Sequence, residues 1–191
     1  REIIHINSEK KYEAKKKAFI LGYKLSLSQK QKINFTKKTS NLFRKQNTSN
    51  AKKIDSSIFN KVISIDPINQ TAIVEAMIRF EDLVATTLEY GFLPPVVPQL
   101  KTITLGGAIS GVGIEATSFK YGLVHETVLE MEVIVSDGRI VACKPVNKYK
   151  DLFFALPNSY GNIGYILKVK ISLIKVKKYL PFMHRNFTDS K

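Results

Sequence analysis

Residues 104–122 read TLGGAISGVGIEATSFKYG and place four glycines within eight positions, between two regions with strand-like sequences. Glycine has no Cβ and adopts positive φ angles, so it lets another group approach the backbone closely. Apolar side chains such as Leu105 and Ile109 interleave with these glycines, which is unusual for an exposed turn. The stretch therefore predicts backbone N–H groups packed around a bound ligand, and a phosphate-bearing cofactor suits such groups.

Two familiar nucleotide-binding motifs do not fit this stretch. The P-loop pattern G-x-x-x-x-G-K-[ST] is absent from the chain. Gly111, Gly113 and Ala116 approach the dinucleotide pattern G-x-G-x-x-G, but the segment directly before the stretch, PQLKTIT over 98–104, is not a convincing strand and nothing amphipathic follows. The glycines therefore indicate a different kind of site.

Composition and charge restrict the class of protein. The chain has 191 residues and 44% of them are hydrophobic, enough to bury one core or two small lobes. No apolar run reaches the ~18 residues of a membrane span, so we expect a cytoplasmic location, with membrane association open for a full-length protein. Cys143 is the only cysteine, which excludes an intrachain disulfide and a thiolate metal site, and we expect no metal.

The net charge of +14 is concentrated near the N-terminus. Residues 1–53 hold 15 of the 30 basic residues and only 3 of the 16 acidic ones. These lysines lack the regular aromatic interleaving of a single-strand nucleic-acid platform. We therefore expect a solvated basic surface, and a binder of nucleic acid or of an anionic membrane is the alternative.

The hydrophobic pattern predicts an α+β fold in which antiparallel pairs dominate the second half. Helices are predicted over 9–22, 79–91 and 150–156, and residues 37–53 are typical of a polar loop. Strands are predicted over 31–35, 61–66, 70–76 and 164–176, with a long hairpin over 126–145. The last strand alternates apolar and basic residues, so we expect one of its faces to be solvated.

Five short motifs follow one another in an order that carries a family resemblance. They are Gly106-Gly107, Tyr121-Gly122, Asp137-Gly138, Asp151-Leu152-Phe153 and Gly161-Asn162-Ile163-Gly164. With them, residues 60–180 resemble the FAD-binding domain of the vanillyl-alcohol oxidase family, the PCMH-type domain. Within that family the chain is most similar to the Delta24-sterol reductases and their bacterial relatives.

The resemblance implies a two-lobed α+β domain, with a largely antiparallel sheet flanked by helices in the second lobe and FAD between the lobes. On this basis we divide the chain into a first lobe, 1–66, which includes the polar loop 37–53, and a second lobe, 67–179. Residues 180–191 then begin a connection to a substrate domain that this sequence does not contain.

The resemblance also assigns residues to the cofactor. The stretch from Thr104 to Ala116 is expected to wrap the pyrophosphate and the flavin through its backbone N–H groups. Its members are Thr104, Leu105, Gly106, Gly107, Ala108, Ile109, Ser110, Gly111, Val112, Gly113, Ile114, Glu115 and Ala116. Gly161, Gly164 and Ile166 are expected to pass close to the cofactor as well.

The first phosphate loop departs from the family pattern. Thr39, Ser40 and Asn41 stand where relatives are glycine-rich, and their hydroxyl and amide donors would hold the phosphates instead. A simple polar turn is the alternative. Neither His nor Cys occurs in this loop or over 104–122, so we expect FAD to be bound non-covalently.

Two further polar residues lie near the glycine-rich stretch. For His125, a polar cap on the following strand is favoured over a flavin contact or proton donor. Glu115 accepts a ribose or backbone hydrogen bond, or it faces solvent.

The resemblance implies a FAD-dependent oxidoreductase in which NAD(P)H reduces the flavin, and the flavin then reduces a carbon–carbon double bond of a sterol-like or lipid substrate. The alternatives are a FAD-dependent alcohol oxidase or dehydrogenase and a non-catalytic flavin-binding fragment. Catalytic residues are expected on the absent substrate domain, so we assign none.

Overall fold

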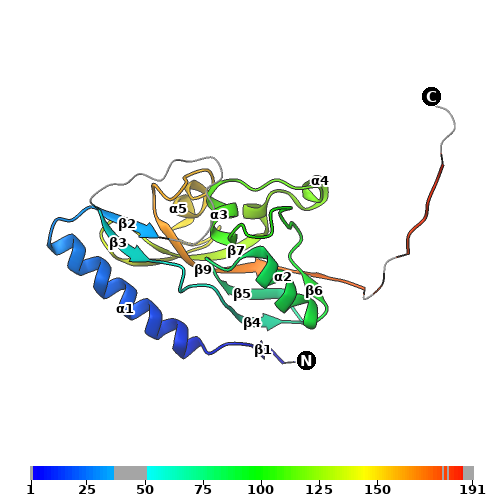
Figure 1. Cartoon of the computed structure of the whole chain (residues 1–191), viewed down its shortest axis with the longest axis horizontal. Coiled ribbons are helices and arrows are strands. Elements are labelled where there is room, and N and C mark those ends of the chain that lie inside the picture. The colour runs from blue at the N-terminus through cyan, green and yellow to red at the C-terminus, as the bar shows by residue number, and fades with distance from the viewer. Residues whose placement is uncertain (1, 37–50, 178, 180, 187–191) are drawn as a thin grey trace.

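The fold is described from a computed structural model, for residues 2–36, 51–177, 179 and 181–186 (Figure 1). Its centre is a six-stranded sheet in the order β1-β4-β5-β9-β7-β8. The strands are β1 (Ile4–His5), β4 (Val62–Asp66), β5 (Thr71–Glu75), β7 (Val128–Ile134), β8 (Ile140–Cys143) and β9 (Tyr165–Ser172). Every pair in this sheet is antiparallel, which confirms the α+β class with a largely antiparallel sheet.

Helices connect and cover these strands. They are α1 (Glu9–Ser28), α2 (Phe80–Glu89), α3 (Leu105–Ser110), α4 (Ser118–Tyr121), α5 (Lys150–Ala155) and the 3-10 helix η1 (Val124–Thr127). The predicted helices correspond to α1, α2 and α5. Helix α1 continues to Ser28, past the predicted end at Gly22, because one glycine costs a helix only about 1 kcal/mol and the buried side chains of Tyr23 and Ser26 hold the last turns in place.

Two small sheets complete the fold. Strand β2 (Ile33–Thr36) pairs in parallel with β3 (Lys52–Asp55), and β6 (Phe92–Leu93) pairs with β10 (Ile174–Lys175). The predicted loop 37–53 therefore ends in a strand, and its Thr39, Ser40 and Asn41 lie outside the described residues.

The predicted boundary between the two lobes passes through the main sheet. The boundary between 1–66 and 67–179 falls in the turn between β4 and β5, which are hydrogen-bonded neighbours. Strands β2 and β3 lie outside that sheet and pack on its end, where the rings of Phe35 and Tyr165 have centroids 4.4 Å apart.

One face of the main sheet is apolar. Val74 of β5, Val169 of β9 and Met131 of β7 are paired across neighbouring strands and are all buried. They share one hydrophobic core with buried residues of α2 and α3, among them Leu83 and Ile109. Burial of this face supplies the main driving force for the fold.

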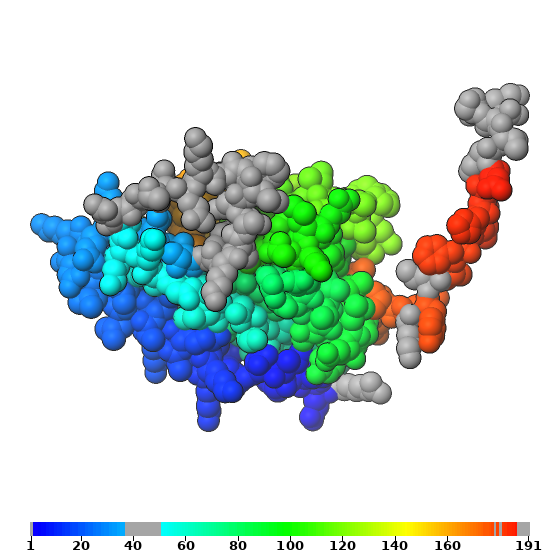
Figure 2. Space-filling model, in the orientation of Figure 1, coloured from blue at the N-terminus to red at the C-terminus, as the bar shows by residue number. Residues whose placement is uncertain are grey.

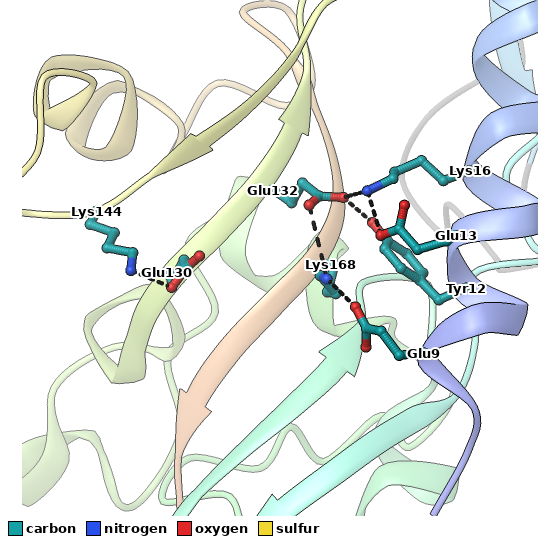
Figure 3. Close-up of polar contacts among 8 residues, drawn as sticks. All are labelled: Glu9, Tyr12, Glu13, Lys16, Glu130, Glu132, Lys144 and Lys168. Atoms are coloured by element: carbon teal, nitrogen blue, oxygen red, sulfur yellow. Dashed lines mark hydrogen bonds and ion pairs between the residues drawn. The ribbon is translucent and has the colours of Figure 1, made fainter. Parts of the chain in front are cut away.

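The other face lies under α1 and is charged. Side chains of β7 and β9 point towards α1 in Figure 3. Lys168 of β9 binds Glu9 at 2.8 Å and lies 4.4 Å from the ring centroid of Tyr12. Glu132 of β7 accepts hydrogen bonds from Tyr12 and, at 3.0 Å, from Lys16. The expectation that this face of the last strand is solvated is therefore wrong, since helix α1 covers it and supplies partners for its charges.

Candidate functional site

The glycine-rich stretch begins with the short helix α3, which was not among the predicted helices. Thr104 caps this helix, because its Oγ1 accepts the N–H of Gly107 at 3.2 Å. The N–H groups of Leu105 and Gly106 donate to the carbonyls of Ile78 (3.0 Å) and Ala76 (2.7 Å). The first turn of α3 thus uses its donors within the protein and offers none of these three to a ligand.

Protein atoms make the close approaches that the glycines permit. A Cβ on Gly106 would stand 3.0 Å from the carbonyl oxygen of Ala76 and 2.9 Å from Cε of Met77. A Cβ on Gly111 would stand 2.9 Å from the carbonyl oxygen of Gly107, and one on Gly113 would stand 2.9 Å from a methyl of Val124. Glycine is therefore required at these positions by neighbouring protein atoms, which leave no room for a side chain. This corrects the interpretation that a bound ligand alone requires it.

Residues 111–116 form the open part of the stretch. Alternate N–H groups donate within the protein, from Gly111 to Gly107, from Gly113 to Ala108 and from Glu115 to the hydroxyl of Ser118. Within the described part of the chain, the N–H groups between them have no protein acceptor; these belong to Val112, Ile114 and Ala116. The segment therefore presents a row of free backbone donors, which suits an electronegative ligand.

The open segment starts at a strained residue. Val112 has a φ of +58°, a conformation that a β-branched side chain rarely adopts. Two contacts hold the backbone on either side of it, since Gly111 and Gly113 are both hydrogen-bonded back to α3. Strain of this kind persists only where surrounding structure enforces it, and it is common at binding sites.

The segment before β9 lies against this stretch. The N–H of Tyr160 donates to the carbonyl of Ser110 at 3.2 Å, and its ring lies next to Gly111. Gly161 follows with a φ of +83°, and a Cβ added to it would meet nothing within 4 Å. Two segments that the sequence assigned to one cofactor are therefore adjacent in space.

Tyr165 joins the same region to the strand that precedes the predicted phosphate loop. Its hydroxyl lies 2.7 Å from Oγ of Ser56 and 3.1 Å from the sulfur of Met77, which itself packs on Gly106. Ser56 donates its N–H to the carbonyl of Thr36 at 3.1 Å. Thr36 is the last residue of β2 and the last described residue before that loop, so the end of β2 reaches this point.

The structure also shows what surrounds the remaining residues that the sequence analysis singled out. Gly164 lets the chain pass β7, since a Cβ there would stand 2.7 Å from a methyl of Val133. Ile166 is buried in the sheet. Glu115 accepts the N–H of Gln99 at 3.3 Å, which is the backbone hydrogen bond considered for it. His125 lies in η1, and its buried Nδ1 has no partner among the described residues.

Burial controls the two weakly acidic groups nearest the sheet. It raises the pKa of Tyr165, more than the hydrogen bond with Ser56 lowers it, so the phenol stays protonated at neutral pH. It also raises the pKa of Cys143 to about 11, and this thiol donates to the carbonyl of Met131. Cys143 is thus a packed side chain. Among the described residues, no group of three or more His, Cys, Asp or Glu side chains is placed to hold a metal.

A cavity of about 690 Å³ opens beside the N-terminus of α3. Two of the segments that line it, 57–62 in cyan and 77–86 in green, adjoin on the surface in Figure 2. Of the predicted cofactor residues that the structure describes, Thr104 alone lies in its wall, and Met77 links the cavity to Tyr165. The lining residues are Asn7, Ser57, Asn60, Lys61, Val62, Met77, Ile78, Arg79, Asp82, Ala85, Thr86 and Thr104.

Sequence reasoning did not find Ser56 and Met77, and no local signal marks either residue. Tyr160 and Tyr165 flank the Gly161–Gly164 motif, so their position in the sequence was a signal that could have found them.

Comparison with known proteins gives a consistent picture. Residues 23–144, more than half of the chain, match the family described as FAD binding domain. Delta(24)-sterol reductase of Pisum sativum is 35% identical over 133 residues, 70% of this chain and 24% of that protein. The Homo sapiens Delta(24)-sterol reductase is 35% identical over 119 residues, 62% of this chain and 23% of that protein.

A second kind of enzyme also matches. Cytokinin dehydrogenase 7 of Oryza sativa subsp. japonica is 33% identical over 108 residues, 56% of this chain and 20% of that protein. The chain spans about a quarter or less of the length of these relatives.

Proposed function

The chain belongs to the FAD binding domain family, and from this premise we propose that it is the cofactor-binding part of a flavin-dependent oxidoreductase. The family match agrees with the resemblance inferred from the five ordered motifs. The observation that carries the proposal is the meeting of residues 104–116, residues 160–166 and the end of β2 around Tyr165 and Met77.

We propose that FAD lies against the open part of the glycine-rich stretch. The free N–H groups of Val112, Ile114 and Ala116 suit phosphate or flavin oxygens, and Gly161 borders the same surface. Thr39, Ser40 and Asn41 enter as further phosphate donors on the basis of the resemblance alone. The absence of His and Cys over 104–122 supports non-covalent binding.

The reaction that we propose is reduction of a carbon–carbon double bond in a sterol-like or lipid substrate, with NAD(P)H as the source of electrons. Two relatives named Delta(24)-sterol reductase, each about 35% identical, support this choice. FAD supplies the hydride chemistry, while this chain holds and orients it. Residues that contact the substrate are expected outside this sequence.

The cofactor is tested directly by denaturing the purified protein and identifying what it releases. We expect a yellow protein that releases intact FAD on denaturation without proteolysis, which is also the result for non-covalent attachment. A colourless protein that gains no flavin absorbance when mixed with FAD would contradict the assignment.

Substitution of Gly161 by Val tests the placement of the cofactor. This position faces open space and has a φ of +83°, so a β-branched residue both strains the turn and covers the surface that we assign to FAD. We expect weaker FAD retention. Gly91 has a similar φ of +80° with nothing within 4 Å, and Gly91→Val is the matched control that should retain FAD. Equal retention in both variants would argue against this placement.

A flavin-dependent oxidase or dehydrogenase, of an alcohol or of another electron donor, is the second candidate, and the match to a cytokinin dehydrogenase favours a dehydrogenase. Anaerobic reduction of the bound flavin distinguishes the two, provided that the full-length protein is used. Bleaching by NADPH or NADH supports the reductase, whereas bleaching by an alcohol or amine substrate supports the dehydrogenase. A flavin that neither class of donor reduces would indicate a binding module.

A further inference from the structure

The outward side of α1 carries a set of exposed residues that the proposed FAD site does not use. At about 100° per residue, positions seven apart lie in line along a helix. Lys10, Lys17 and Lys24 form one such line, and Ala14 and Leu21 form the next. We call the exposed set Lys10, Ala14, Lys17, Leu21, Lys24 and Leu25 the α1 stripe.

The stripe is positively charged because the acidic residues of α1 are used elsewhere. Glu9 binds Lys168 at 2.8 Å, and Glu13 binds Lys16 at 2.7 Å, both on the side of the helix that meets the sheet (Figure 3). Within the described residues, the three stripe lysines have no acidic partner. The two carboxylates of α1 are therefore each paired with a lysine outside the stripe, while the ammonium groups of the stripe are left uncompensated among the described residues.

Two leucines interrupt these lysines in an exposed position. Leu21 is 71% exposed and Leu25 is 56% exposed, although Phe19 and Tyr23 of the same helix are buried. Exposed leucines beside lysines match the boundary of a bilayer, where anionic headgroups meet acyl chains. A nucleic-acid backbone would attract the lysines but would offer the leucines nothing.

The position of the stripe suits a broad, flat partner. In Figure 2, α1 is coloured in blues and forms a margin of the molecule from which side chains project outward. The 20 residues of α1 give the helix a length of about 30 Å, so the three lysines are spread over a long contact line.

We propose that the α1 stripe binds an anionic membrane surface, with Lys10, Lys17 and Lys24 at the lipid phosphates and Leu21 and Leu25 at the acyl boundary. Part of the basic excess of residues 1–53 then has a partner. The proposal stands independently of the proposed oxidoreductase activity.

Flotation of the whole chain with vesicles tests this proposal. We expect it to float with vesicles of phosphatidylcholine mixed with phosphatidylserine, and not with phosphatidylcholine alone. Binding should weaken steeply as salt is added. Lys17→Gln combined with Lys24→Gln should lower the partition coefficient about 5-fold per lysine. Lys148→Gln combined with Lys150→Gln makes the same charge change at exposed positions away from α1 and should have little effect.

Substitution of a leucine tests whether binding depends on apolar contact as well as on the charge of the lysines. Leu21→Gln should weaken binding at constant net charge, whereas Val146→Gln, at a position that is 91% exposed, should not. Circular dichroism should show that all four variants fold, since every substituted residue is exposed. Equal loss in the α1 and control variants would overturn the proposal. Preferential binding to double-stranded DNA, or salt-dependent self-association without vesicle binding, would also overturn it.

Discussion

The two faces of the main sheet are held by different physical means. On the apolar face, Val74, Val169 and Met131 pack in the core, and α3 approaches so closely that Gly106 leaves no room for a side chain. On the other face, α1 packs Phe19 and Tyr23 into the core and is also held by ion pairs and hydrogen bonds around Glu132 and Lys168. The first face depends on close packing alone, whereas the second adds matched charges, so the two should respond to different perturbations.

The largest effect is expected where shape leaves no freedom. In Gly106→Val, the new Cβ would stand 3.0 Å from the carbonyl oxygen of Ala76, which is backbone and cannot rotate away. Since the added methyl groups also have no space, we expect a loss of about 3 kcal/mol in the free energy of unfolding. Urea unfolding followed by circular dichroism measures it.

Gly22 supplies the matched control from the other side of the sheet. It lies inside α1 with nothing within 4 Å of an added Cβ. Gly22→Ala should therefore raise the free energy of unfolding by about 0.5–1 kcal/mol, because alanine is the better helix former. If Gly106→Val and Gly22→Ala change the free energy of unfolding in the same direction, the difference in packing between the two faces is not supported.

The next largest effect is expected at the buried charge beneath α1. Glu75 is 1% exposed, and it binds the ammonium group of Lys15 and the N–H of Lys61. Lys15→Met would leave this carboxylate with the N–H of Lys61 as its remaining partner among the described residues, and the loss of one hydrogen-bond partner should cost about 2 kcal/mol. The same unfolding measurement applies.

The partner variant separates loss of a pair from burial of an unpaired charge. Glu75→Gln removes the buried negative charge and keeps an acceptor for Lys61, and Lys15, 27% exposed, still reaches water. We expect a smaller loss, about 1 kcal/mol. A larger loss from Glu75→Gln than from Lys15→Met would contradict this account of the charged face.

The same contrast explains which parts of the fold the sequence could predict. The β7–β8 hairpin was predictable because its signal is local: Asp137-Gly138 marks the turn, and Gly138 has a φ of +80°. The covering of the last strand was not, because the partners of Lys168 are Glu9 and Glu132, which lie far from it in the chain. An alternating apolar and basic strand looks the same whether water or a helix compensates its lysines.

The glycine-rich stretch shows the same limit at the candidate site. Its motifs predicted the FAD family, which the match over residues 23–144 supports. Helix α3 was missed because two adjacent glycines disfavour a helix by about 1 kcal/mol each, and contacts with Ala76 and Ile78 outweigh that cost. The sequence therefore indicated a candidate site, but it could not separate glycines that serve packing from residues that we assign to the cofactor.

Alkaline pH should weaken the charged face selectively. Burial, followed by the hydrogen bond to Glu132, raises the pKa of Tyr12 above its ordinary value near 10. The unfolded chain then releases this proton above pH 10 while the folded chain keeps it, so stability is fully present below pH 10 and falls above it. One such proton corresponds to about 1.4 kcal/mol per pH unit.

Removal of the phenol tests this slope. Tyr12→Phe loses the hydrogen bond to Glu132, so it should be less stable at neutral pH, yet its stability should fall less steeply between pH 10 and 11. Urea unfolding at several pH values measures both quantities. The pKa of Tyr23 is also raised by burial and is common to both proteins, so the difference between their slopes reports Tyr12 alone. Parallel curves would contradict the assignment.

The smallest effect is expected where the apolar side ends and the open segment begins. Val112 holds a φ of +58°, for which glycine has no steric penalty, but glycine costs more chain entropy on folding. Val112→Gly should therefore raise the free energy of unfolding by no more than about 1 kcal/mol, whereas Val112→Ala keeps the unfavourable φ and should bring no gain. If the strain serves only to end α3, the glycine variant should retain FAD as well as the parent does. If it retains less while gaining stability, the strained residue fixes the direction of the free N–H groups at 112, 114 and 116, and shape determines the cofactor surface as well as the core beneath it.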